Sequence, residues 1–326
     1  MKKIIAIIAV VLLASVLCFC FIGCAEKTDF TVGIIQLVTH DALDAATKGF
    51  QDALKEELAK EGKTVKFDYQ NAADDKTACT TIANSFVSKQ VDLIMANATA
   101  ALQASAAATT TIPILGTSIT EYSVALGLDN FNGTVGGNIS GTSDLAPLTE
   151  QAQMIVDLLP NAKKIGFLYC SAEPNSDYQV KAVSDYLVAL NQGYTCVRYS
   201  FSDSNDINSV VNSIVAQGCD AVYIPTDNTA ASNGPTIKAV LGAANIPIFA
   251  GEEGICKSSD GIVTLSISYY NIGVKTGKMA AEILLGKASV STMAIQYDEA
   301  PVKKYNAARC QALGITVPAG YVALEA

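Results

Sequence analysis

Apolar runs alternate with helical patterns along almost all of this 326-residue chain, and no other feature constrains its fold as strongly. Residues 30–36 form a mostly apolar run typical of a buried strand, and residues 42–60 carry apolar side chains at helical spacing. The first half continues with strands expected at 65–69, 92–96 and 112–116 and helices at 76–87 and 99–109. Repeated strand–helix units predict a parallel sheet covered on both faces by right-handed crossover helices.

The same alternation restarts after a glycine-rich interruption at residues 136–141. The second half is expected to contain helices at 145–159, 177–190, 206–216 and 229–244 and strands at 165–169, 194–199, 221–224 and 246–250. The sequence therefore predicts an α/β protein with two doubly wound parallel-sheet lobes. The pattern leaves open which lobe holds the strand 261–266 and the helix 269–285.

The charge balance excludes two classes of protein. The chain has 22 lysines and arginines against 31 acidic residues, a formal net charge of −9, whereas nucleic-acid binding needs a basic surface. It is 50% hydrophobic and only 16% charged, which is the opposite of a disordered chain. We therefore expect a folded, acidic protein with no nucleic-acid partner.

The N-terminus combines a basic start with a long apolar segment. Two lysines precede the apolar residues 4–21, and a polar stretch follows Cys24. The tetrad Phe-Ile-Gly-Cys that ends at Cys24 resembles a bacterial lipobox, so we expect a lipoprotein signal peptide at 1–23 and a tether at 24–29. Diacylation of Cys24 would anchor the protein on the extracytoplasmic face of the bacterial cell membrane. The alternative, an uncleaved membrane anchor, gives the same location.

The remaining cysteines give no sign of a metal site. They are Cys79, Cys170, Cys196, Cys219, Cys256 and Cys310. No two of them have CxxC spacing and the chain has a single histidine, so we expect no metal site. Their even number permits disulfides, and the alternative is buried free thiols that pack as small hydrophobic side chains. Glycine-rich phosphate-binding motifs are also absent, so no cofactor is expected.

Ligands of open α/β sheets bind at the carboxyl ends of the strands, and these ends can be located in the sequence. The first half offers three nearly neutral segments rich in hydroxyl groups, and the second half offers three segments that contain carboxylates. They are residues 36–40, 97–100 and 116–118, and residues 170–176, 226–229 and 251–253.

Thr99 and Asp227 form the most informative pair in these segments. Thr99 begins a helix, so its hydroxyl and the free backbone N–H groups beside it can bind an anion without a basic residue. Asp227 occupies the corresponding place in the second half, where its carboxylate can receive an ammonium group. Each residue can also be an ordinary helix cap. As a pair across a cleft, they predict a zwitterionic ligand.

His40 and Tyr270 are further candidates with simpler alternatives. His40 precedes an acidic helix start and can be an exposed neighbour of the cap, and a lone histidine without a nucleophile motif does not indicate catalysis. Tyr270 can stack on an aromatic ligand or serve as packing.

Several segments carry a family resemblance. They are residues 32–36, 40–44, 141–144, 173–176, 225–229, 251–254 and 276–280, with Tyr270. Together they resemble the TrpX-type substrate-binding lipoproteins of ABC importers, over nearly all of the mature chain. The resemblance implies a type I periplasmic-binding-protein fold with three crossovers near Gly141, Ser266 and Ser291. It implies that lobe 1 comprises 30–141 plus 267–291 and lobe 2 comprises 142–266 plus 292–326.

The resemblance also implies a function and its partners. The protein would capture a small zwitterionic ligand, in the better-known members an aromatic amino acid such as tryptophan or tyrosine, between two closing lobes. It would act as a monomer and deliver the ligand to an ABC permease and its ATPase. The expected ligand-binding residues are Gln36, His40, Thr99, Ala100, Ser118, Asn175, Ser176, Asp227, Asn228, Glu252 and Tyr270.

Two other classes of protein share this pattern. An extracellular ligand sensor would have the same fold and the same site. A two-domain enzyme such as a cysteine-pair racemase would also show two similar halves, with Cys79 and Cys219 as its reactive pair. Cys79 falls within an expected helix and Cys219 before an expected strand, away from the carboxyl ends of strands, so we expect no enzymatic activity.

Overall fold

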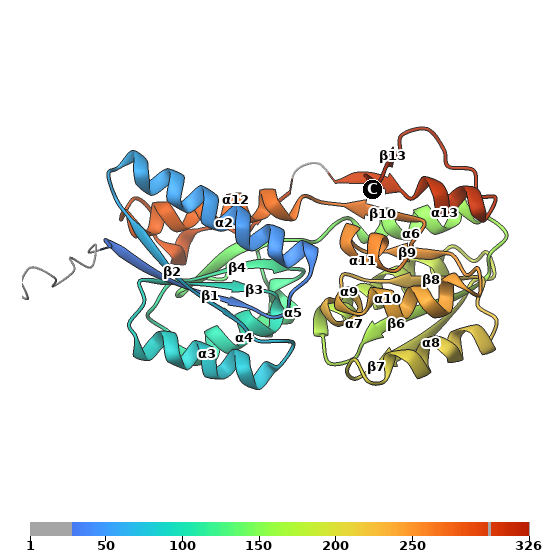
Figure 1. Ribbon diagram of the computed structural model, residues 1–326, viewed down its shortest axis with the longest axis horizontal. Coiled ribbons are helices and arrows are strands. Elements are labelled where there is room, and N and C mark those ends of the chain that lie inside the picture. The colour runs from blue at the N-terminus through green and yellow to red at the C-terminus, as the bar shows by residue number, and fades with distance from the viewer. Residues whose placement is uncertain (1–27, 299–300, 326) are drawn as a thin grey trace, which may run out of the picture.

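The computed structural model describes residues 28–298 and 301–325, which form two α/β lobes lying side by side (Figure 1). The predicted signal peptide and Cys24 lie outside the described residues. Lobe 1 contains β1 (Phe30–Gln36), α2 (Asp41–Lys60), β2 (Val65–Asn71), α3 (Lys76–Ser88), β3 (Leu93–Asn97), α4 (Thr99–Ala108), β4 (Ile114–Ile119), α5 (Tyr122–Leu126), β5 (Ile139–Ser143), α12 (Tyr269–Leu284), η3 (Val290–Thr292) and β11 (Gln296–Tyr297).

The sheet of lobe 1 has the strand order β11-β5-β4-β3-β1-β2, and all of its pairs are parallel. Its central strands are buried on both faces, which is why they read as nearly continuous apolar runs. Val32 and Ile34 pack under α2 and α12, and Ile35 packs on the opposite face with α3 and α4.

Lobe 2 contains α6 (Leu148–Leu158), β6 (Lys164–Cys170), α7 (Pro174–Ala189), β7 (Thr195–Phe201), α8 (Ile207–Ala216), β8 (Ala221–Ile224), α9 (Asn228–Ser232), α10 (Gly234–Ile237), η2 (Lys238–Gly242), β9 (Ile248–Ala250), α11 (Glu253–Ser258), β10 (Val263–Ser266), β12 (Val302–Tyr305), α13 (Ala307–Ala312) and β13 (Val322–Ala323). Its strand order is β13-β12-β10-β9-β8-β6-β7, and β12 runs antiparallel to β10. The two predicted parallel-sheet lobes are therefore present.

Helix α12, which the pattern could not assign, belongs to lobe 1 because it packs closely against α2. A Cβ atom on Gly49 would lie 2.1 Å from the carbonyl oxygen of Tyr270, and one on Gly273 would lie 2.1 Å from that of Ala46. Glycine at both positions lets the two helix backbones approach each other. Strand β10 pairs with β9 and thus belongs to lobe 2.

Two lobe boundaries differ from the sequence-based expectation. Strand β5 continues to Ser143, so lobe 1 does not end at residue 141. Residues 292–297, which were expected in lobe 2, return to lobe 1, because Gln296 pairs with Thr142 and Ile295 is buried in the lobe 1 core. The chain thus passes between the lobes after Ser143, between β10 and α12, and between β11 and β12. The third boundary was missed because β11 is two exposed residues without an apolar pattern.

The helix expected at 229–244 is divided into α9, α10 and the π-helical segment η2. Pro235 lies at the start of α10 and has no backbone N–H, so it cannot donate to the carbonyl of Ala231 and the first helix ends. The other expected helices are present with bounds shifted by a few residues.

All six cysteines of the described chain are free, and five of them are buried. Burial raises the pKa of Cys79, Cys196 and Cys310 to about 11, so these thiols stay protonated at neutral pH. No helix among the described residues is long and apolar enough to span a membrane.

Candidate functional site

The two lobes touch each other across the space between them. Nε2 of His40 lies 3.3 Å from Oδ1 of Asn228, and the hydroxyl oxygen of Thr229 lies 3.2 Å from Oδ2 of Asp74. Nζ of Lys76 donates to the backbone carbonyl of Ala172. These contacts join lobe 1 to lobe 2 through side chains at the carboxyl ends of the strands, so the lobes are closed.

A cavity of about 220 Å³ lies between the closed lobes. Lobe 1 lines it with the start of α4, including Thr99 and Ala100, and lobe 2 lines it with the starts of α7 and α9, including Asn175 and Asn228. Four of the residues expected to bind ligand therefore meet at one cavity.

Two residues near the carboxyl ends of β3 and β4 have unfavourable backbone conformations. Ala98, just before α4, has φ of +89° and provides no side-chain cap, so the first N–H groups of this helix have no side-chain acceptor from it. Ser118, at the end of β4, has φ of +55°, and its buried hydroxyl has no hydrogen-bond partner. Positive φ at non-glycine residues is costly and is concentrated at binding and catalytic sites.

The lobe 2 wall is acidic, and its carboxylates serve as helix caps. Oδ1 of Asp227 accepts from the Ala230 N–H at 2.8 Å and Oδ2 from the Cys170 N–H at 2.6 Å. Glu173 accepts four hydrogen bonds from the backbone and side chains of Asn228 and Thr229. Burial, with the nearby charge of Glu173, raises the pKa of Asp227 well above its ordinary value.

A second, very small space of about 10 Å³ adjoins Asn228 and is lined by acidic groups, and we call it the acidic void. Its lining side chains are His40, Leu43, Asp144, Thr226, Asp227, Asn228, Ala231, Glu252 and Tyr269. Burial raises the pKa of Asp144 to about 6 and that of Glu252 to about 7, and it lowers the pKa of His40. Unpaired negative charge is thus unfavourable here, and a cationic group would relieve it.

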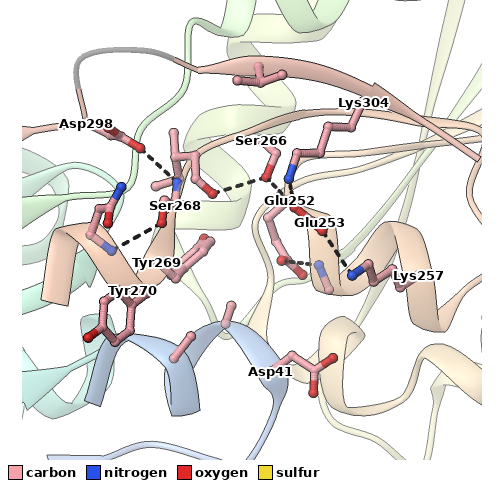
Figure 2. Close-up of a pocket in the computed structure, with 16 residues that line it drawn as sticks. Asp41, Glu252, Glu253, Lys257, Ser266, Ser268, Tyr269, Tyr270, Asp298 and Lys304 are labelled. Atoms are coloured by element: carbon pink, nitrogen blue, oxygen red, sulfur yellow. Dashed lines mark hydrogen bonds and ion pairs between the residues drawn. The ribbon is translucent and has the colours of Figure 1, made fainter. Parts of the chain in front are cut away.

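A third cavity, of about 460 Å³, lies beside the crossovers, and we call it the hinge cavity (Figure 2). Figure 2 shows Glu253 between Lys257 and Lys304, which both form ion pairs with it. Glu252 and Tyr269 line both the hinge cavity and the acidic void, so they separate the two spaces.

The structure places three expected residues away from the site. Gln36 is buried inside lobe 1, where its side-chain carbonyl accepts from the Thr47 hydroxyl at 2.7 Å. Ser176 is fully buried inside lobe 2. Tyr270 lies in the hinge cavity and donates to Asp52, so the tyrosine that faces the space between the lobes is its neighbour Tyr269.

Sequence reasoning missed Asp144, which lines the acidic void. It stands at the end of one of the segments that carry the family resemblance, directly after β5. Its position after a strand was the available signal, since the same rule selected Thr99 and Asp227.

Comparison with known proteins identifies the family. The sequence matches the family described as ABC transporter substrate binding protein over residues 31–323. The chain belongs to this family. Substrate-binding proteins of ABC importers are extracytoplasmic binding proteins and not enzymes.

Relatives of this substrate-binding protein include a curated "Tyrosine-binding protein" from Clostridioides difficile. It is 40% identical over 263 residues, which are 81% of this chain and 75% of the relative. A solved structure of an ABC domain in complex with L-Trp from Streptococcus pneumoniae is 32% identical, with a TM-score of 0.83, and the match covers 91% of this chain and all of that one. The two lobes have the fold of type I periplasmic binding proteins.

A third relative differs in the arrangement of its lobes. It is a ligand-free, open structure of a Clostridium difficile substrate binding protein with adhesive properties, 35% identical and matched over 91% of this chain and all of that one. Its TM-score is only 0.67, although its sequence is slightly more similar than that of the L-Trp complex. A closed arrangement of the lobes in the present chain accounts for this difference, in agreement with the contacts between them.

Proposed function

We propose that this protein captures an aromatic amino acid between its lobes and presents it to an ABC importer. One observation carries the proposal: the uncapped start of α4 and a buried acidic void face the same space between the lobes. A positive helix end and a group of carboxylates together complement a zwitterion. The names of two relatives, one for tyrosine and one in complex with L-Trp, support an aromatic side chain.

The α-carboxylate of the ligand would bind at the start of α4. Backbone N–H groups of Thr99 and Ala100 are available there, and the helix dipole favours an anion. The unpartnered hydroxyl of Ser118 lies at the end of the neighbouring strand and would donate a further hydrogen bond.

The α-ammonium group would bind at the acidic void, among Asp144, Asp227 and Glu252. Asp227 would lie beside this group as well, although both of its oxygens already accept backbone N–H groups. Its negative charge would still attract the ammonium group, because a carboxylate can accept more than two hydrogen bonds.

The aromatic ring would extend into the 220 Å³ cavity, which shares Asn228 with the acidic void. An apolar cavity of about 150 Å³ in another protein holds benzene, so this space is large enough for a phenol or indole ring. Leu37, Ala100 and Pro174 supply apolar contacts along its walls.

We also propose the cellular arrangement predicted from the N-terminus. The mature protein would be a monomer held on the membrane by a diacylated Cys24, close to a permease and its ATPase. Replacement Cys24→Ser should abolish lipid labelling and leave an uncleaved precursor or a protein that partitions out of the detergent phase. Lipid labelling that persists in this variant would contradict the proposal.

The experiment that tests the ligand uses the purified chain without its predicted signal peptide. Mass spectrometry of small molecules released by denaturation should identify tyrosine, tryptophan or phenylalanine. Calorimetry with these amino acids, with leucine and with a deaminated 3-arylpropanoate should then rank the aromatic amino acids first. Equal binding of leucine, or no binding of any amino acid, would refute the proposed function.

A further inference from the structure

Asp144 differs from the other carboxylates of the acidic void in having an oxygen without a partner. Its side chain is only 4% exposed, and its Oδ2 accepts from the Tyr269 hydroxyl at 2.9 Å. Its Oδ1 is buried and has no hydrogen-bond partner. Asp227 and Glu252, by contrast, each accept from two backbone N–H groups. Asp144 is thus the carboxylate of this void that keeps one oxygen, Oδ1, without a hydrogen-bond donor.

His40 contributes a second unpartnered acceptor to the same void. Nδ2 of Asn228 donates to Glu173 at 2.8 Å, so its Oδ1 faces Nε2 of His40 and accepts a hydrogen bond from the N–H there. The histidine therefore carries its proton on Nε2, and its buried Nδ1 is an acceptor without a partner. Both unpartnered atoms are acceptors, so the group that completes the void must be a donor. An ammonium group has three donors and a positive charge.

The spacing along the edge of the lobe 1 sheet fits an α-amino acid. Asp144 follows β5, and Thr99 follows β3, with only β4 between these strands. Two strand spacings amount to about 9–10 Å. The nitrogen and carboxylate oxygens of an α-amino acid lie about 3 Å apart, and a charge-assisted hydrogen bond of about 2.8 Å at each end gives a span of about 9 Å.

Asp144 also lies on the hinge. It is the first residue after β5, where the chain crosses to lobe 2, and its partner Tyr269 begins α12, where the chain returns to lobe 1. Next to Tyr269, the Ser268 N–H donates to Asp298 at 2.8 Å, on the third connection (Figure 2). Hydrogen bonds between neighbouring residues therefore link all three connections between the lobes, and Asp144 is at one end of this network.

We infer that Asp144 and His40 bind the α-ammonium group of the ligand, with Asp144 as its countercharge, and that the buried charge of Asp144 opposes closure of the empty lobes. This inference rests on the proposed function and names the residues that make it selective for amino acids. Closure without ligand buries an ionised carboxylate with an unpaired oxygen, which is unfavourable. A bound ammonium group removes this cost, so the ligand favours the closed state.

Asp144→Asn tests the inference because it keeps the shape of the side chain and removes its charge. Calorimetry should compare tryptophan with 3-(indol-3-yl)propanoate, which lacks the amino group. The affinity of the variant for tryptophan should fall roughly 10- to 150-fold, as expected for loss of a hydrogen bond to a charged group, while its affinity for the deaminated analogue stays equal or rises. The matched control is Asp41→Asn, which removes an exposed carboxylate next to His40 and should change either affinity less than two-fold.

Small-angle scattering tests the effect on the hinge. Ligand-free Asp144→Asn should populate the closed state more than the ligand-free wild type and should therefore have a smaller radius of gyration. Equal radii of the two ligand-free proteins would overturn this part of the inference.

The outcomes separate this inference from the proposed function. A wild type that binds no amino acid refutes the proposed function. A wild type that binds tryptophan, together with an Asp144→Asn variant that binds it equally well, overturns the inference alone. If Asp144→Asn does not fold, His40→Ala provides the test, since this side chain is only half-buried. The affinity of that variant should fall several-fold for tryptophan and not for the analogue, and an equal fall for both ligands would overturn the inference.

Discussion

Lowering the pH from 7 to 5 should weaken the binding of an aromatic amino acid about ten-fold. The cause is Asp144, whose pKa is raised by burial to about 6 from an ordinary 3.8, against the opposing effect of the Tyr269 hydroxyl, which donates to it, and of the nearby Thr120. An ammonium group beside this carboxylate stabilises its ionised form and returns its pKa towards the ordinary value. Binding therefore releases a proton at any pH between the two values.

The direction and size of the change in affinity follow from this coupling between ligand binding and proton release. At pH 7 the Asp144 carboxylate is about nine-tenths ionised, so a further rise in pH gains little affinity through this residue. At pH 5, one unit below the pKa that Asp144 has in the closed lobes, only about a tenth of the empty closed protein has this carboxylate ionised. The apparent affinity then falls about ten-fold, or about 1.4 kcal/mol. The α-carboxyl and α-ammonium groups of the ligand do not titrate in this range.

The other titratable groups around the void act in the same direction. Burial raises the pKa of Glu252 to about 7 and that of Asp227 above its ordinary value, so their protonation at low pH also removes negative charge from the ammonium site. The pKa of His40 is lowered by burial, so this ring is neutral over most of the range. The hydroxyl of Tyr269 has a pKa far above the range and stays protonated. A ten-fold loss is therefore a lower bound.

The assay can use the fluorescence of a tryptophan ligand, because the chain contains no tryptophan. Calorimetry at pH 6 in two buffers with different heats of ionisation should count the protons released on binding. The deaminated analogue is the control, and its affinity should fall less than about two-fold between pH 7 and pH 5, which is the loss expected from partial protonation of its own carboxyl group. An affinity for tryptophan that is constant over this range, with no proton released, would refute the reasoning.

Three further predictions concern single sites and the whole molecule. Asp227→Asn leaves the N–H of Cys170 or Ala230 without a charged acceptor, so chemical denaturation should show a loss of about 1–3 kcal/mol in the free energy of unfolding. An unchanged free energy would show that these two hydrogen bonds do not stabilise the fold. Ser118→Ala removes an unpartnered hydroxyl, so stability should hold while calorimetry shows about ten-fold weaker ligand binding; unchanged affinity would remove Ser118 from the site. Saturating ligand should compact the wild type in small-angle scattering, and equal radii despite demonstrated binding would exclude lobe closure.

The general architecture could be predicted because it depends on local patterns. Strands such as 30–36 and 221–224 are buried on both faces, so nearly all of their side chains must be apolar. The ends of such strands must lie at one edge of a sheet, which is why Thr99, Asn175 and Asn228 could be placed at one cavity from the sequence.

Short or polar elements could not be predicted, because their pairing partners are distant in the chain. Strand β11 consists of two exposed residues, and its pairing with Thr142 and Ser143 decides where lobe 1 ends. The sequence also could not choose between Tyr269 and Tyr270, because the first turn of α12 points one of them towards the lobes and the other towards α2.

The sequence by itself determined two parallel-sheet lobes and the loops in which a ligand would bind, since side-chain burial repeats with the period of each strand and helix. Only the tertiary structure decided which of those loop residues are free to bind. The carboxylate of Asp227 already accepts a hydrogen bond from the N–H of Cys170, 57 residues away, whereas one oxygen of Asp144 has no donor. Such a difference depends on hydrogen bonds between remote segments, and these exist only once the sheet has brought the segments together.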